Sequence, residues 1–438
     1  MIRRCLITLF AIAALSGFAR AEIAIQEVTS PGGITAWLVE ERSIPIVAME
    51  IDFQGGTSLD RPGKEGAVNL MTGLLEEGTD DMDAAAFQRA TEELATRFSF
   101  DAGRDSVNVT LQSLSENIDA SVELLRRALT APAFNATAVE RVRGQVISSL
   151  RSDATDPNVI ARRTFYELAF PGHPYGRPPD GTLETVTALT ADDLRAAHRD
   201  ALTRGRAFIG VVGDISAAEL APLLDRLLGD LPAEGPPLPP RTEIAVGGGV
   251  TVVDFDTPQS VAMFGEAGLE RKDPDFFAAY VMNHILGGGG FSSRLTEEVR
   301  EKRGLTYGVA SYLVPFDHAA LYLGSVASAN DRIAQAIDLI RKEWRRMAEG
   351  GVTEEELDAA KRNLTGSYPL RFTSNAAIAG QLVGMQIDDL GIDYMIHRND
   401  RINAITREDI ARVAKRLLMP ENLRVVVVGR PVGLESTD

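Results

Sequence analysis

Two long segments of the chain carry hydrophobic residues at every third or fourth position, the period of an α-helix. The first stripe, which stops before Pro132, comprises Ile118, Val122, Leu125 and Leu129. The second, which stops before Gly350, comprises Ile333, Ile337, Ile340, Trp344 and Met347. Each stripe predicts an amphipathic helix that buries one face, and we attach no function to the stripes themselves.

A strand-like run stands ahead of each predicted helix. Residues 107–111 (VNVTL) precede the first helix, and residues 320–324 (ALYLG) precede the second. Farther upstream, hydrophobic and polar residues alternate through Met49, Ile51 and Phe53, as in a half-buried strand. Strand groups followed by long helices predict an α+β sandwich in each half of the chain.

A second pattern occurs twice, which indicates an internal repeat. Thr190 and Thr406 each have an aspartate three positions later, then an apolar-periodic segment, then a run of mainly small and branched apolar residues. These runs end at Gly213 and Gly429, 23 positions after the threonine in both cases. Each copy predicts a threonine-capped helix followed by a buried strand.

Between the two copies lies a segment with five prolines in ten residues, 231–240. Prolines at this density fit neither a helix nor a central strand, so residues 231–248 are predicted to form a stiff, extended linker. The expected organisation is therefore two homologous α/β sandwich domains, each an antiparallel sheet plus helices, over residues 22–230 and 249–438.

The N-terminus has the layout of a cleavable secretory signal. Arg3 and Arg4 precede an apolar run to Leu15, and residues 19–21 (Ala-Arg-Ala) provide a small-x-small cleavage site. The apolar run is short for a spanning helix, although an uncleaved anchor is the alternative. We expect residues 1–21 to be removed after Ala21 and the mature chain to be periplasmic.

Cysteine usage and charge narrow the possible functions. Cys5 is the only cysteine and lies in the predicted signal, which leaves the mature chain without disulfides or cysteine ligands. The formal net charge is −17, and loss of Arg3, Arg4 and Arg20 makes it more negative. Such a chain repels phosphate, so we expect neither nucleic acid nor, after signal cleavage, a membrane surface as a partner.

Several segments, in order along the mature chain, resemble the pitrilysin/insulinase family of zinc peptidases, the inverted zincins that include mitochondrial-processing-peptidase-like proteins. They are residues 170–176 (FPGHPYG), 286–295 (LGGGGFSSRL), 299–307 (VREKRGLTY), 357–361 (LDAAK) and 428–429 (VG). The resemblance implies two homologous domains per chain. It also implies that the histidine of residues 173–176 belongs to a fold feature rather than to a ligand set.

Active members of that family carry His-x-x-Glu-His on a helix of the first domain, where two histidines bind zinc and the glutamate activates water. The corresponding stretch here is residues 66–79 (GAVNLMTGLLEEGT), and it places Asn69, Thr72 and Gly73 at those positions. The family's more distant glutamate should fall near Ser149 or Leu150, where no acid occurs. Neither asparagine nor glycine can supply an imidazole nitrogen at about 2 Å from zinc.

Other residues could in principle replace the lost ligands. The five histidines are His173, His198, His284, His318 and His397, and no two are spaced as a helical ligand pair. Glu76 and Glu77 could form a displaced acid pair, but we expect them in the solvated last turn of the helix that ends before Gly78. We therefore predict no metal and no cofactor in this chain.

One part of the family's machinery is retained. Arg300 and Tyr307 match an arginine and a tyrosine, seven positions apart, that hold the substrate carbonyl and the developing oxyanion in active members. A guanidinium and a phenol are suitable donors for that charge. The alternatives are a surface ion-pair network for Arg300 and an ordinary strand position for Tyr307. The glycines of residues 287–290 lack the remainder of a phosphate-loop motif, so we interpret them as a flexible turn.

The resemblance implies a non-catalytic subunit of a periplasmic heteromeric zinc metallopeptidase. Its expected partners are a homologous subunit that carries the zinc and a peptide or unfolded-protein substrate. Arg300 and Tyr307 would then contact substrate in the partner's site. The alternative is a structural or peptide-binding homodimer, or a scaffold, without peptidase activity.

Overall fold

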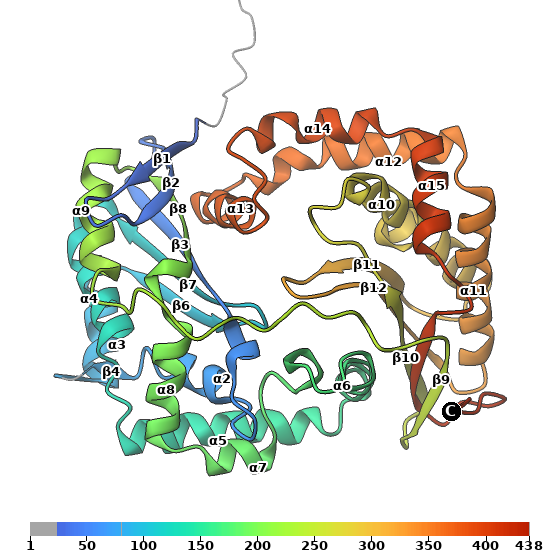
Figure 1. The fold of residues 1–438 in the computed structure, drawn as a ribbon, viewed down its shortest axis with the longest axis horizontal. Coiled ribbons are helices and arrows are strands. Elements are labelled where there is room, and N and C mark those ends of the chain that lie inside the picture. Colours follow the sequence, from blue (N-terminus) through green and yellow to red (C-terminus); the bar gives the residue numbers. More distant parts are fainter. Residues whose placement is uncertain (1–23, 80, 438) are drawn as a thin grey trace, which may run out of the picture.

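The computed structural model describes residues 24–79 and 81–437, so the predicted signal peptide lies outside the described residues. Two halves face each other, each built from one sheet and a set of helices (Figure 1). The first sheet contains β1 (Gln26–Thr29), β2 (Thr35–Glu40), β3 (Ile46–Gln54), β6 (Arg97–Ala102), β7 (Ser106–Leu114) and β8 (Ala207–Gly213). The second contains β9 (Gly249–Asp254), β10 (Gln259–Ala267), β11 (Val309–Pro315), β12 (Ala320–Ala329) and β13 (Arg424–Gly429). The predicted α+β class is confirmed.

The helices follow the same division. The first half holds α2 (Ala67–Thr72), α3 (Ala84–Glu93), α4 (Ile118–Thr130), α5 (Ala136–Asp153), α6 (Pro157–Ala169), α7 (Leu183–Ala188), α8 (Ala191–Ala201) and α9 (Ala217–Leu228). The second holds α10 (Phe276–Asn283), α11 (Ile333–Gly350), α12 (Glu354–Gly366), α13 (Asn375–Ile387), α14 (Tyr394–Ala404) and α15 (Arg407–Leu417). A short ribbon of β4 (Gly78–Thr79) and β5 (Met82–Asp83) lies beside the first sheet. The two stripes seen in the sequence form α4 and α11, as predicted.

The internal repeat is visible in the strand order. The first sheet runs β1-β2-β8-β3-β7-β6, and the second, read from its other end, runs β9-β13-β10-β12-β11. Each contains one parallel pair, β2 with β8 and β9 with β13, in an otherwise antiparallel sheet. Thr190 and Thr406 cap α8 and α15 through capping boxes with Asp193 and Asp409. Sequence and topology therefore repeat together, although the parallel pair was not predicted.

One helix of each half packs on the sheet of the other half. Helix α6 packs on β10 and β13, with Phe165 in one cluster with Val261 and Val426. Helix α13 packs on β8 and β3, with Leu382 against Val212. Because each half's own helices cover only one face of its sheet, this exchange covers the apolar residues on the second face, such as Trp37 and Val212 in the first sheet.

The exchanged helices approach the sheets closely at two glycines. A Cβ atom at Gly210 in β8 would lie 2.4 Å from the carbonyl oxygen of Ala379. A Cβ atom at Gly265 in β10 would lie 2.8 Å from Cζ of Phe165. Glycine is needed at both positions because a side chain there would push the packed helix, α13 or α6, away from the sheet.

The halves also meet where two hairpin turns approach each other. Asp105, in the β6–β7 turn, accepts the Tyr175 hydroxyl at 2.5 Å and the Asp317 amide at 3.2 Å. The Tyr175 oxygen in turn accepts the amide of His318, from the β11–β12 turn, at 3.0 Å. Burial raises the pKa of Asp105 to about 6. Residues 173–176 therefore contribute to the junction between the halves, as a fold feature.

The proline-rich segment lies against the protein rather than spanning open solvent. The Ala245 amide donates to the Ala169 carbonyl and the Thr242 amide donates to the His318 carbonyl, each at 2.8 Å. His173 Nε2 lies 3.0 Å from the Pro240 carbonyl oxygen. The segment thus adds contacts to both halves.

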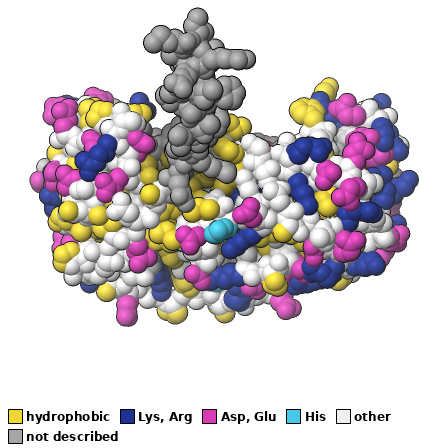
Figure 2. All heavy atoms as spheres, turned by 90° about the horizontal axis from the view of Figure 1, so that it is seen from above, with side chains coloured by type: hydrophobic (Ala, Val, Ile, Leu, Met, Phe, Trp, Pro, Cys, Tyr) yellow, Lys and Arg dark blue, Asp and Glu magenta, His cyan; other side chains and the backbone are white. Residues whose placement is uncertain are grey.

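The surface carries charges of both signs. On the face drawn in Figure 2, acidic and basic side chains are interspersed over both halves. Several form ion pairs, such as Arg345 with Glu421 at 2.6 Å. Within residues 24–79 and 81–437, no helix has the length and apolar character needed to span a membrane.

One carboxyl group is buried in the second half. Glu266, 3% exposed, accepts Trp344 Nε1 at 2.6 Å and the Met419 amide at 3.0 Å. Burial raises its pKa to about 7, because the two donated hydrogen bonds only partly offset desolvation. The Glu266 carboxyl group therefore keeps its proton up to a higher pH in the folded chain than in the unfolded chain.

The Phe165→Ala variant tests the helix exchange. Phe165 is fully buried, so we expect the free energy of unfolding to fall by about 3–5 kcal/mol. Phe291→Ala is the matched control: Phe291 is 75% exposed, so its effect should stay within about 0.5 kcal/mol. Urea unfolding of both variants measures the difference. Equal effects would show that α6 does not depend on this contact.

The buried Glu266 predicts a pH effect. Its folded pKa is raised, so the folded state binds more protons between its ordinary pKa and about 7, and stability falls as the pH rises through that interval. In Glu266→Gln this part of the fall, at most about 3 kcal/mol, should disappear. Urea unfolding between pH 4.5 and 8 measures it. Parallel pH profiles for the two proteins would contradict the assignment.

Candidate functional site

The positions of the lost zinc motif lie on and just after the short helix α2. The Asp60 carboxylate holds the start of this helix by accepting the amides of Gly66 at 2.8 Å and Val68 at 2.9 Å. Burial raises the pKa of Asp60 to about 7 in spite of these two hydrogen bonds. Gly66 adopts φ 89°, a left-handed conformation that favours glycine at the helix entry.

None of the three motif positions offers a metal ligand. Thr72 is buried and donates its hydroxyl to the Val68 carbonyl of its own helix at 2.8 Å. Asn69 is half-buried on the same helix. A Cβ atom at Gly73 would lie 3.3 Å from Cγ1 of Val142 in α5, so the wall opposite this position is aliphatic. The chemistry of this donor set does not fit zinc.

The distal position is also without an acid. Ser149 is exposed and Leu150 is half-buried, both on α5. Among the residues that the structure describes, no group of three or more His, Cys, Asp or Glu side chains is placed to hold a metal ion.

The prediction that Glu76 and Glu77 lie in the last turn of the helix is wrong. Helix α2 ends at Thr72, Gly73 forms its C-cap, and the two glutamates follow in a turn. Glu76 is exposed, whereas Glu77 forms an ion pair with Arg141 of α5. Gly73 has the right-handed backbone of an ordinary helical residue (φ −66°), so the glycine itself does not explain the early end.

Of the five histidines, His173 and His318 lie near each other at the junction between the halves, where their ring centroids are 4.8 Å and 5.9 Å from that of Tyr175. Nε2 of His198 lies 2.7 Å from the Leu129 carbonyl oxygen, and His397 lies beside Asp400 on α14. Burial lowers the pKa of His198 and of His284.

Arg300 and Tyr307 line the same open hollow, of about 470 Å³, at the outer end of the second sheet. Tyr307 precedes β11 and is 87% exposed, so it is not a member of the strand. The Arg300 guanidinium lies 4.6 Å from the ring centroid of Phe291 and 3.5 Å from Glu301. Two donors of the predicted kind are therefore brought together and face solvent.

The surface network around them centres on another residue. Glu298 pairs with Lys302 and Arg303, both at 2.7 Å, which lowers the pKa of Glu298 to about 2. Arg300 instead stacks on Phe291, which follows the glycine-rich turn of residues 287–290. Sequence reasoning did not identify Phe291, whose 75% exposure distinguishes it from the other phenylalanines of residues 24–79 and 81–437.

A second feature missed from the sequence is the free edge of β6. This strand ends the first sheet, and a hollow of about 740 Å³ beside it is lined by Arg97 and Phe98 of the strand and by Glu77 and Arg141. An edge strand presents unpaired backbone donors and acceptors that can hold an added strand. The edge of β6 and the hollow beside it are therefore present without the zinc ligands.

Comparison with known proteins agrees with this geometry. The family described as Insulinase (Peptidase family M16) matches residues 37–182, and the Peptidase M16 inactive domain matches residues 188–364. A non-peptidase homologue from Helicobacter pylori is 29% identical over 78% of this chain and 79% of its own. A probable mitochondrial-processing peptidase subunit beta from Schizosaccharomyces pombe is 25% identical over 93% and 92%.

Solved structures extend the agreement to the fold. The crystal structure of a peptidase M16 inactive domain from Pseudomonas fluorescens matches with a TM-score of 0.88 and 28% identity. It covers 94% of this chain and 99% of that one. A protease from Helicobacter pylori, at 18% identity and a TM-score of 0.84, shares the fold. The chain is a member of the insulinase family of peptidases, M16, in which it stands as a non-catalytic form whose zinc-motif positions are Asn69, Thr72 and Gly73.

Proposed function

We propose that this protein is the non-catalytic subunit of a heteromeric zinc metallopeptidase of the periplasm. The observation that carries the proposal is that this chain lacks one part of the family's catalytic residues and keeps another. The zinc positions on α2 have lost every ligand, while Arg300 and Tyr307 stay together in an open hollow. Exposed donors with no metal site of their own suit a site completed by a second, zinc-bearing chain.

The chemistry of the pair supports an oxyanion role. A guanidinium and a phenol donate hydrogen bonds where negative charge develops on the substrate carbonyl, and such donors are effective when held in place beforehand. Stacking on Phe291 restricts where the Arg300 guanidinium can move. The partner would supply the zinc and the water-activating carboxylate, and this chain would add donors and strand edges.

The predicted signal of residues 1–21 supports a periplasmic location, with which the absence of cysteine after residue 21 is compatible. The homologous partner would carry His-x-x-Glu-His, because both chains then share one architecture and can enclose a common chamber. A homodimer or scaffold without peptidase activity is the outcome that the following experiments would reveal if no such partner exists.

Replacing the pair tests the proposed role. We expect Arg300→Ala to lower the kcat/KM of the reconstituted complex by about 10²-fold or more, and Tyr307→Phe to lower it in the same direction. Tyr307 is exposed and Arg300 is half-buried with no buried hydrogen-bond partner, so the melting temperature should change little. Arg345→Ala, an exposed arginine on α11, is the matched control. Unchanged activity in both variants, with an assembled complex, would refute the proposal.

Restoring the motif alone should not restore a metal site. In the triple variant Asn69→His, Thr72→Glu, Gly73→His, the distal acid is still missing and the new side chain at position 73 meets Val142 at 3.3 Å from its Cβ. We expect no stoichiometric zinc in the purified variant by elemental analysis, as in the wild type. Zinc bound at one equivalent, with chelator-sensitive peptide cleavage, would show that this chain is closer to an active enzyme than we infer.

A further inference from the structure

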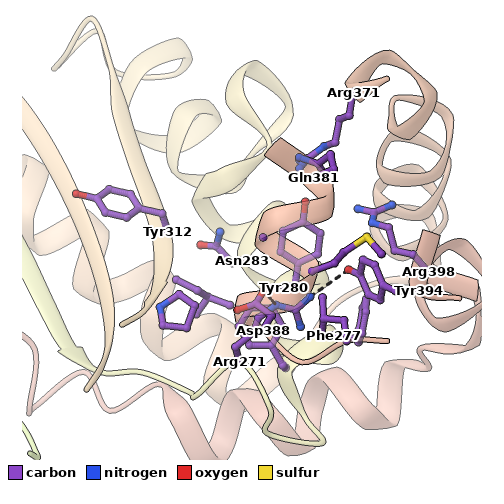
Figure 3. A pocket seen from close by; sticks show the side chains of 16 residues that line it. Arg271, Phe277, Tyr280, Asn283, Tyr312, Arg371, Gln381, Asp388, Tyr394 and Arg398 are labelled. Carbon is purple, nitrogen blue, oxygen red and sulfur yellow. Dashed lines mark hydrogen bonds and ion pairs between the residues drawn. The ribbon is translucent and has the colours of Figure 1, made fainter. Parts of the chain in front are cut away.

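A separate hollow of about 410 Å³ lies within the second half, between α10, α13, α14 and the edge strand β11 (Figure 3). Helix α13, on one wall of this hollow, is also the helix that packs on the other half's sheet. Three guanidinium groups line it, from Arg271, Arg371 and Arg398. We call it the arginine pocket.

Only one of these arginines is neutralised. Arg271 pairs with Asp388 at 3.0 Å and donates to the Tyr394 hydroxyl at 3.1 Å. Within the described part of the chain, neither Arg371 nor Arg398 has a carboxylate partner. The arginine pocket therefore has excess positive charge, in a chain whose net charge is −17.

Arg398 is the informative residue, because it is only 4% exposed. Its neighbours are neutral: the Leu364 carbonyl and Asn399 Oδ1, each at 3.0 Å, and the ring of Tyr368, 4.2 Å from the guanidinium carbon. Burying a cation without a counter-charge is unfavourable, and hydrogen bonds to neutral groups offset only part of the loss. An anion at this end of the pocket, beside the exposed Arg371, would supply the missing charge.

The rest of the lining suits an apolar or aromatic group. Phe277, Tyr280, Tyr312 and Tyr394 contribute rings, and the volume lies within the roughly 300–1,000 Å³ typical of ligand sites. Figure 3 shows Tyr280 between Arg371, Gln381 and Arg398 on one side and Arg271 on the other. A ligand with a negative head and a hydrophobic side group matches both parts.

The strand on one wall indicates what kind of molecule carries that head. Tyr312 and Leu313 are consecutive in β11 and point to opposite faces of the sheet, yet both line the pocket. The pocket therefore follows the edge of β11, which is the outermost strand of its sheet. Residues 284–288 pack on this edge at Ser311, and beyond it, from Tyr312, an extended peptide can add through its backbone.

We propose that the arginine pocket binds the C-terminus of an extended peptide. The terminal carboxylate lies at Arg371 and Arg398, the last side chain lies among the aromatic rings, and the preceding residues pair with β11. The inference rests on the proposed function only in taking a peptide as the ligand. It requires no zinc and no partner, because every residue of the pocket belongs to this chain.

The test uses the mature chain and a fluorescein-labelled hexapeptide of alanine and serine that ends in phenylalanine, read by fluorescence anisotropy. The free acid should bind about tenfold or more tighter than the same peptide with a C-terminal amide. N-acetylphenylalanine, which has the acid and the ring but no strand, should bind far more weakly than the peptide. Equal binding of acid and amide would overturn the proposal, and equal binding of N-acetylphenylalanine would identify a small-molecule site instead.

Single substitutions test whether Arg371 recognises the terminal carboxylate. Arg371→Ala, at an exposed position, should lower affinity for the acid about tenfold and leave the amide unaffected. Arg362→Ala, an exposed arginine on α12 outside the pocket, is the control and should change neither. An unaltered preference for the acid in Arg371→Ala, with an unchanged melting temperature, would refute the assignment. Because this assay contains no partner, its failure is separate from a failure of the Arg300 and Tyr307 experiment.

Discussion

The constraint on which this structure depends is that some strands of each sheet, β2 and β8 in the first and β10 and β13 in the second, are apolar on both faces, and the helices of the same half cover only one face. Strand β13 is buried along its whole length, and β10 is buried except at its ends. The remaining face is covered by a helix from the other half, α6 on the second sheet and α13 on the first. Neither half can bury its sheet alone, so the halves are held at a fixed separation.

Because the halves stand apart, there is room between them for a functional site. The hairpin turns around Asp105 and Asp317 join the halves at one point, and the linker adds contacts along the side. Between the halves, the edge strands β6 and β11 each end a sheet. Loss of zinc ligands from α2 leaves this framework intact, because the motif positions carry little of the packing. Thr72 bonds within its own helix, and Gly73 is at the surface.

Loss of catalytic residues and retention of binding surfaces are therefore physically independent in this fold. Zinc chemistry needs imidazole and carboxylate groups at a few positions of one short helix. Peptide binding needs strand edges, donors and pockets supplied by many elements. In this chain the zinc ligands are missing, whereas Arg300, Tyr307 and the pocket around Arg398, for which we propose binding roles, are present.

The sequence alone determined the α+β class, the repeat, the helices α4, α8, α11 and α15, and the missing zinc ligands. These follow from local periodicity, from capping residues such as Thr190 and Thr406, and from residue types that cannot coordinate a metal. It did not determine the early end of α2, the exchange of α6 and α13, the stacking of Phe291 on Arg300, or the unpaired charge of Arg398. Those depend on which surfaces meet between segments far apart in the chain, and neither hydrophobic period nor motif spacing encodes which of several apolar faces a helix will cover.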